Sequence, residues 1–128
     1  MTRSLFVYGT LKRDASGKPH PLLRSAKRLG RASVSGLLYD LGQYPCLVRA
    51  RSNGHRVFGE LYQLDEGALS HVLRALDEYE GREFERRRVY VILPNGQRRA
   101  AWTYVLRGRL PRSAQHVSSG RYAKRGVA

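Results

Sequence analysis

The stretch VFGELYQLDEGALSHVLRALDEYEG, residues 57–81, predicts a strand followed by a helix. Its first part, residues 57–64, alternates between apolar and polar positions well enough to form a strand. Asp65 is typical of a residue that begins a helix, and Gly81 is typical of one that ends it. Between them, apolar residues recur at the i, i+3, i+4 and i+7 spacing that gives a helix one apolar face. These residues are Leu69, Val72, Leu73 and Leu76.

Shorter strands are predicted on both sides of this stretch. Residues 94–97, with the sequence PNGQ, are typical of a hairpin turn between two of them. The turn chemistry of residues 14–21 predicts a loop, and residues 22–29 predict a short helix. Because strands then flank one main helix, we expect an α+β domain whose sheet is curled or barrel-like. The predicted strands are residues 4–8, 32–41, 46–50, 88–93 and 100–106.

A chain of 128 residues is expected to form a single domain, residues 1–128, with its own core. Residues 107–128 form a basic tail, rich in Gly, Pro, Ser and Arg, that we expect to be irregular. No stretch reaches the roughly 20 apolar residues that span a bilayer, and the N-terminus has no apolar run of signal-peptide length. The expected compartment is therefore the cytoplasm. A single cysteine excludes an internal disulfide, and we interpret Cys46 as a buried, small apolar residue.

The formal charge of +14 indicates affinity for polyanions. Of the 24 basic residues, 20 are Arg, a bias that a GC-rich genome also produces. The basic residues are spread over nearly the whole chain, and no aromatic residues alternate with the densest runs as a stacking surface for single strands requires. We therefore expect weak, non-specific polyanion binding, and we treat nucleic-acid binding as a minor alternative for the main function.

Glu80 is the most informative residue for chemistry. At about 100° per residue, its side chain falls within roughly 20° of Leu69, on the apolar face of the helix, whereas Glu78 points the opposite way. Burial and the negative end of the helix dipole both raise the pKa of a carboxyl, toward the range where it accepts and donates protons near neutral pH. The alternative, in which the helix frays at Tyr79 and Glu80 turns to water, stays open on periodicity alone.

A second candidate site follows the first predicted strand, at Val7-Tyr8-Gly9-Thr10-Leu11. A Gly after an apolar strand lets backbone N–H groups turn outward, where they bind a carboxylate or an oxyanion. An ordinary strand end has the same pattern, so this motif alone leaves both interpretations open. The four His residues are scattered without metal-ligand spacing, and the sequence has no glycine-rich phosphate loop, zincin motif or nucleophile elbow.

Together these motifs resemble the γ-glutamylcyclotransferase-like family. The YGTLKR sequence of residues 8–13 is most similar to its γ-glutamylamine cyclotransferase, or AIG2-like, branch and to the bacterial relatives of that branch. The combination of YGTL with LDEYEG is specific, whereas either motif alone is not. The resemblance covers nearly the whole chain, through residues 6–11 (FVYGTL), 42–45 (GQYP), 57–62 (VFGELY), 76–81 (LDEYEG), 84–86 (FER) and 119–122 (SGRY).

The resemblance implies a small mixed β-barrel with one main flanking helix. It also implies an enzyme that releases 5-oxoproline from a small-molecule substrate, a γ-glutamyl amine or γ-glutamyl amino acid, whose own α-amino group is the nucleophile. It implies no metal and no organic cofactor. The lack of an apolar stretch that spans a bilayer predicts no membrane partner. In this family the acid–base position corresponds to Glu80, and the substrate-binding loop corresponds to Tyr8, Gly9, Thr10 and Leu11.

Two residues depart from the family pattern and bear on the identity of the substrate. Phe84 stands where a Tyr is common, and Arg121 stands where the family often has an acidic residue.

The alternative function is a non-catalytic protein that binds a γ-glutamyl or amino-acid ligand. An inward carboxylate at Glu80 argues against this alternative, because it would not help a protein to bind an anionic ligand. The leaving amine and the oligomeric state stay open. Gly59, inside a predicted strand, predicts that another segment or the ligand passes close by.

Overall fold

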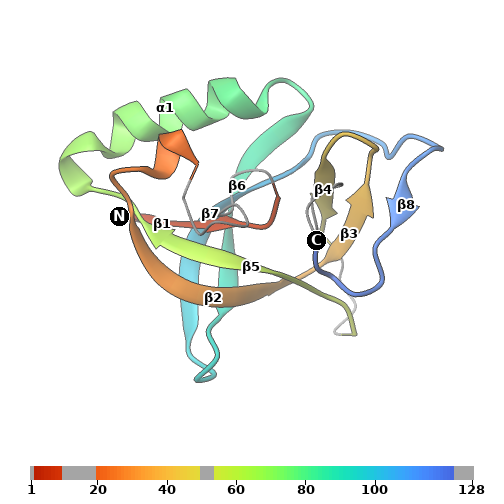
Figure 1. Ribbon diagram of the computed structural model, residues 1–128, viewed down its shortest axis with the longest axis horizontal. Coiled ribbons are helices and arrows are strands. Elements are labelled where there is room, and N and C mark those ends of the chain that lie inside the picture. Colours follow the sequence, from red (N-terminus) through yellow and green to blue (C-terminus); the bar gives the residue numbers. More distant parts are fainter. Residues whose placement is uncertain (1, 10–19, 50–53, 123–128) are drawn as a thin grey trace.

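Five strands of the computed structural model close into a mixed barrel (Figure 1), which confirms the predicted fold class. The structure describes residues 2–9, 20–49 and 54–122. Neighbouring barrel strands are antiparallel except the first and last, which pair in parallel through Leu5 and Trp102 and so close the barrel. In order around the barrel, the strands are β1 (Ser4–Val7), β5 (Arg56–Gln63), β2 (Lys27–Ser35), β6 (Phe84–Ile92) and β7 (Arg98–Leu106).

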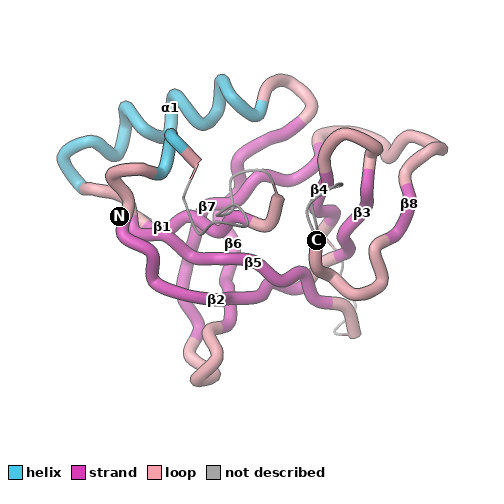
Figure 2. The backbone as a smooth tube through the Cα atoms, in the orientation of Figure 1, coloured by secondary structure: helices cyan, strands magenta, loops and turns pink. Residues whose placement is uncertain are grey.

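Three shorter strands form a second sheet beside the barrel (Figure 2). The prediction of one continuous strand over residues 32–41 was wrong, because the chain bends at Gly36 between β2 and β3. A Cβ at Gly36 would lie 2.7 Å from the Leu47 side chain and 3.0 Å from the Val48 carbonyl oxygen, so the bend packs against the next strand only with Gly. The order in this sheet is β4 (Pro45–Val48), β3 (Leu37–Asp40) and β8 (Gln115–His116), the last of which lies in the tail that was expected to be irregular.

The helix predicted over residues 22–29 is wrong. Only one 3₁₀ turn forms, η1 (Pro21–Leu23), and β2 already begins at Lys27. The reason is pairing across the barrel: Lys27 lies opposite Gln63, and the pairing continues along β5. This ladder satisfies backbone groups that a helix would otherwise have to satisfy. The predicted turn at residues 94–97 is confirmed, since the Leu93 N–H donates to the Gln97 carbonyl oxygen at 2.9 Å.

The main helix, α1 (Leu69–Glu80), begins later than predicted. Asp65 precedes a 3₁₀ turn, η2 (Glu66–Ala68), and its side chain makes no capping hydrogen bond there. The predicted end is confirmed: Gly81 has a φ of 76°, and its N–H donates to the Asp77 carbonyl oxygen at 3.1 Å. Within the described ranges, no helix is both long enough and apolar enough to cross a bilayer.

Helix α1 lies along one side of the barrel (Figure 1), and its apolar side chains pack against barrel residues. Leu76 is completely buried there, and each large apolar side chain so buried contributes about 1.5–3 kcal/mol. This packing fixes the rotation of the helix about its axis, and therefore the direction in which its last residue points. The buried cluster includes Leu69, Leu73 and Leu76 from α1 and Leu5, Tyr62, Phe84 and Tyr104 from the barrel.

Gly59 of β5 confirms the predicted close approach of another segment. A Cβ at this position would lie 2.2 Å from the Val7 carbonyl oxygen and 2.9 Å from the Phe6 ring. Any side chain at this position would therefore push β1 away from β5. The end of β1 forms part of the pocket described next, so Gly59 also fixes the position of that pocket's wall.

Candidate active site

A pocket of about 350 Å³ lies where β1 and α1 both end. Its wall comes from residues 6–9 at the end of β1, residues 43–45 at the start of β4, residues 79–84 at the end of α1, and Tyr104 of β7. Three of the motifs recognised in the sequence, FVYGTL, GQYP and LDEYEG, thus contribute to one concave site. Tyr8, Gly9 and Glu80 all line it, although more than 70 positions separate Gly9 from Glu80 in the sequence.

Glu80 is the last residue of α1 and faces this pocket. Its side chain is half-buried, and burial raises the pKa of the carboxyl from its ordinary value of 4.5 to about 7. The helix does not fray at Tyr79, and the neighbouring Glu78 is exposed. The protonated and ionised forms of Glu80 are therefore both populated at neutral pH. A group that accepts a proton and then returns it must be able to adopt both forms.

Tyr8 is buried, and its hydroxyl is fixed by the fold. It donates a hydrogen bond to the Tyr104 carbonyl oxygen at 2.6 Å and accepts one from the Leu47 N–H at 3.0 Å. Burial raises the pKa of this phenol, so it stays protonated. Because both hydrogen bonds are to the protein backbone, Tyr8 offers the pocket its ring and its backbone rather than a free hydroxyl.

Gly9 follows Tyr8 and lies directly against the GQYP segment. A Cβ at Gly9 would lie 2.7 Å from the Pro45 ring, so only Gly permits this approach. The contact fixes the backbone of the turn relative to the pocket. Thr10 and Leu11, which were also expected to bind substrate, lie outside the described residues.

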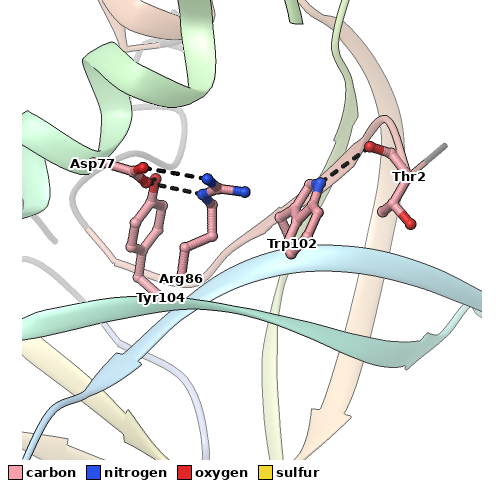
Figure 3. Close-up of polar contacts among 5 residues, drawn as sticks. All are labelled: Thr2, Asp77, Arg86, Trp102 and Tyr104. Atoms are coloured by element: carbon pink, nitrogen blue, oxygen red, sulfur yellow. Dashed lines mark hydrogen bonds and ion pairs between the residues drawn. The ribbon is translucent and has the colours of Figure 1, made fainter. Parts of the chain in front are cut away.

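A hydrogen-bonded network on one side of the pocket was not found from the sequence (Figure 3). The Tyr104 hydroxyl donates to Asp77 Oδ1 at 2.5 Å, and Arg86 donates to both Asp77 oxygens at 2.9 and 3.3 Å. Burial opposes ionisation of Asp77, but the hydrogen bonds from Arg86 and Tyr104 outweigh it and lower the pKa of this carboxyl. The network joins α1 to β6 and β7 and holds the Tyr104 ring in the pocket wall.

The network continues from Arg86 to Trp102 and Thr2, on the right of Figure 3. The Arg86 guanidinium lies 4.6 Å from the centre of the Trp102 ring, and the Trp102 indole N–H donates to the Thr2 carbonyl oxygen at 3.0 Å. Such a cation–π contact stabilises by about 0.5–1 kcal/mol at an exposed site. Arg86 is therefore held from two sides, which orients it toward Asp77.

The rim of the pocket contains a second link that the sequence did not indicate. The Tyr44 hydroxyl donates to a Glu83 carboxylate oxygen, and the Tyr44 ring packs edge-on against Phe84 at 5.7 Å between ring centres. This link joins the GQYP segment to the turn after α1. Phe84 lines the pocket with its ring, so a Tyr at this position would place a hydroxyl at or near the site.

The remaining candidate groups are accounted for in the described part of the chain. Cys46 is fully buried, as interpreted, and burial raises the pKa of its thiol to about 11, so the thiol stays protonated at neutral pH. Across residues 2–9, 20–49 and 54–122, no three His, Cys, Asp or Glu side chains gather as a metal site would require.

Comparisons with known proteins agree with one another over most of the chain. The family model described as "Gamma-glutamyl cyclotransferase, AIG2-like" matches residues 5–124. A Bos taurus protein named gamma-glutamylaminecyclotransferase is 37% identical in an alignment over 101 residues, and the alignment covers 70% of this chain but only 56% of the bovine protein. The crystal structure of YkqA from Bacillus subtilis has a TM-score of 0.73 and 27% identity over 95% of this chain and 40% of that one. A Mus musculus AIG2-like structure has a TM-score of 0.71 and 26% identity, with 98% of both chains covered.

Proposed function

We propose that this chain, which belongs to the γ-glutamyl cyclotransferase, AIG2-like family, releases 5-oxoproline from a γ-glutamyl amine or γ-glutamyl amino acid. The observation that carries the proposal is Glu80, a half-buried carboxyl with a pKa of about 7 that lines one pocket together with Gly9. The name of the bovine relative supports a γ-glutamyl amine as the class of substrate.

The proposed reaction needs no nucleophile from the protein. The substrate's own α-amino nitrogen attacks the γ-carbonyl carbon, which forms the C–N bond of the lactam, and the original amide C–N bond then breaks. Protons must move from the attacking ammonium to the departing nitrogen, so that the products are a lactam N–H and a protonated amine. Ionised Glu80 accepts a proton from the first nitrogen and donates it to the second, and a further cycle moves the other proton.

The pocket contributes by holding the substrate in the bent conformer that cyclises. Its volume of about 350 Å³ lies within the range of small-molecule sites, so that water is displaced when a γ-glutamyl group enters. Intramolecular attack gains greatly from such orientation. In this proposal the backbone N–H groups of the loop from Tyr8 to Leu11, including Gly9 and Thr10, hold either the α-carboxylate or the oxygen that gains charge.

The experiment that tests the proposal is incubation with a panel of γ-glutamyl amines and γ-glutamyl amino acids, followed by mass spectrometry for 5-oxoproline. We expect turnover by the unaltered protein, a fall of about 100-fold in Glu80→Gln, and no change in Glu78→Gln. Glu78 is the matched control because it lies on the same helix and is exposed. Ligand binding with no 5-oxoproline from any substrate would instead identify a non-catalytic binding protein. The cytoplasmic location and the weak polyanion binding stay predictions.

A further inference from the structure

The outer surface of the hairpin formed by β6 and β7 has no part in the proposed reaction. In the second half of β6, buried side chains alternate with exposed ones, and the exposed set points away from the interior of the barrel. Figure 1 shows the turn of this hairpin on the side of the barrel away from α1. The surface, called the hairpin face below, consists of Arg88, Tyr90 and Ile92 of β6 and Arg98, Ala100 and Trp102 of β7. None of these residues lines the active-site pocket.

Tyr90 lies beside two guanidinium groups on the hairpin face. The guanidinium carbons of Arg88 and Arg98 lie 5.3 and 5.2 Å from the centre of its ring. Ala100 lies directly opposite Tyr90 and is too small to cover the ring, and Tyr90 stays 52% exposed. Along the sequence, no aromatic residues alternate with the densest basic runs. The pairing of β6 with β7 nevertheless brings basic residues from two of these runs together around one aromatic ring.

The charges of these two Arg residues are not neutralised within residues 2–9, 20–49 and 54–122. Arg88 donates through Nε to the Thr2 hydroxyl oxygen at 3.0 Å and through Nη1 to the Tyr90 hydroxyl oxygen at 3.5 Å, and both acceptors are uncharged. The Arg98 side chain forms no hydrogen bond or ion pair with any described residue. The hairpin face contains no acidic residue. It therefore presents two positive charges beside one exposed ring, with no negative charge of its own.

This combination matches the parts of a nucleotide. A guanidinium that lies over a ring keeps N–H donors free in its own plane, and such donors match the paired oxygens of a phosphate. An exposed aromatic ring stacks on the flat face of a base. Along a single strand, each base has a phosphate on either side. A duplex keeps its bases stacked inside the helix, and an acidic polypeptide offers charges but no base, so the single strand is the ligand that uses all three side chains.

We infer that the hairpin face binds single-stranded nucleic acid, with Arg88 and Arg98 on successive phosphates and a base stacked on Tyr90. The binding is independent of the proposed reaction, because the hairpin face and the active-site pocket share no residue. Phosphates and base faces are common to all sequences, so the binding is tolerant of sequence and weakens as the salt concentration rises. It locates on one surface an affinity for polyanions that the net charge alone assigns to the whole chain.

The test measures the binding of a fluorescently labelled oligouridine by anisotropy over a series of KCl concentrations. The double variant Arg88→Gln/Arg98→Gln should make the slope of log Kobs against log[KCl] shallower by about 1.4, because each phosphate contact on a single strand contributes about 0.7. Tyr90→Ala should weaken binding by about 10-fold, as loss of one stacked base predicts, and Tyr90→Phe should keep the affinity because it keeps the ring. All three side chains are exposed and line no part of the pocket, so 5-oxoproline release and Tm stay unchanged.

A matched control separates a local site from diffuse charge. Arg109→Gln/Arg112→Gln removes the same charge from two exposed residues that follow the other end of β7, and it should change neither the slope nor the affinity as the hairpin variant does. Equal losses in the two double variants, or full affinity in Tyr90→Ala, would refute the inference. Tighter binding of polyglutamate than of oligouridine would show that the occupant is an acidic polypeptide, and tighter binding of duplex RNA would show that no base stacks on Tyr90; either result overturns the inference.

Discussion

Glu80→Gln separates catalysis from stability, because the two should change in opposite directions. Gln keeps the shape of the side chain, but its amide neither donates nor accepts a proton in the reaction. Turnover should therefore fall by about 100-fold. The free energy of unfolding should rise at neutral pH. The folded-state pKa of Glu80 is raised from 4.5 to about 7, so folding favours the protonated carboxyl. Ionisation of this group therefore opposes folding.

The size and pH range of the effect follow from those two pKa values. Below pH 4.5 the carboxyl is protonated in both states, and Glu80 carries no penalty. The penalty grows as the pH rises from 4.5 to about 7 and is constant above. At 1.36 kcal/mol per pKa unit the limit is about 3 kcal/mol, and solvent screening of a half-buried group reduces it to about 2 kcal/mol. Gln removes this penalty, so Tm should rise by about 6–10 °C at pH 8 and stay unchanged at pH 4.

The assay is Tm by calorimetry and turnover by 5-oxoproline release, both at pH 4 and pH 8, for the unaltered protein, Glu80→Gln and Glu78→Gln. A carboxylate held ionised by one of the many Arg residues would give the reverse pattern. In that case Gln would lower Tm at pH 8 and leave turnover intact, and the assignment of Glu80 as the acid–base would be refuted.

Three further predictions follow from other parts of the molecule. Gly59→Val should destabilise by about 3 kcal/mol in chemical denaturation, because its Cβ would overlap the Val7 carbonyl oxygen. Gly67→Ala should change little, because its Cβ would lie at an ordinary contact distance of 3.4 Å from Asp65 Oδ2. An equal effect of the two variants would contradict the close packing of β1 on β5. Tyr104→Phe removes the hydrogen bond to Asp77 and should cost about 1 kcal/mol, with the exposed Tyr90→Phe as the neutral control. Heparin binding should be weak and collapse between low and moderate salt, and a nanomolar, sequence-specific nucleic-acid complex at physiological salt would contradict it.

Local patterns predicted the parts of this molecule that depend on one segment at a time. The apolar stripe from Leu69 to Leu76 predicted both the helix and the face that it buries, and the same periodicity predicted that Glu80 points inward. Gly59 predicted a close approach because a Gly inside a strand often marks a close backbone approach or a bend. In each case one face of one element is decided by its own sequence.

Pairing between distant segments could not be predicted in the same way. The bend at Gly36 depends on Leu47 of the next strand, and the early start of β2 depends on its ladder with β5. Likewise, the helical position of Asp77 places it beside the apolar stripe but does not reveal its partner Tyr104, which lies 27 residues away on β7.

The central claim is intramolecular attack by the substrate's own α-nitrogen, with Glu80 carrying the protons. The most direct measurement uses a γ-glutamyl amide labelled with heavy nitrogen at its α-amino group, in water enriched in heavy oxygen, with product masses recorded over time. The predicted product is 5-oxoproline that retains the nitrogen label and contains no oxygen from water, formed about 100-fold more slowly by Glu80→Gln. Glutamate that contains oxygen from water would instead show hydrolysis, and equal rates for both proteins would show that Glu80 does not carry the protons.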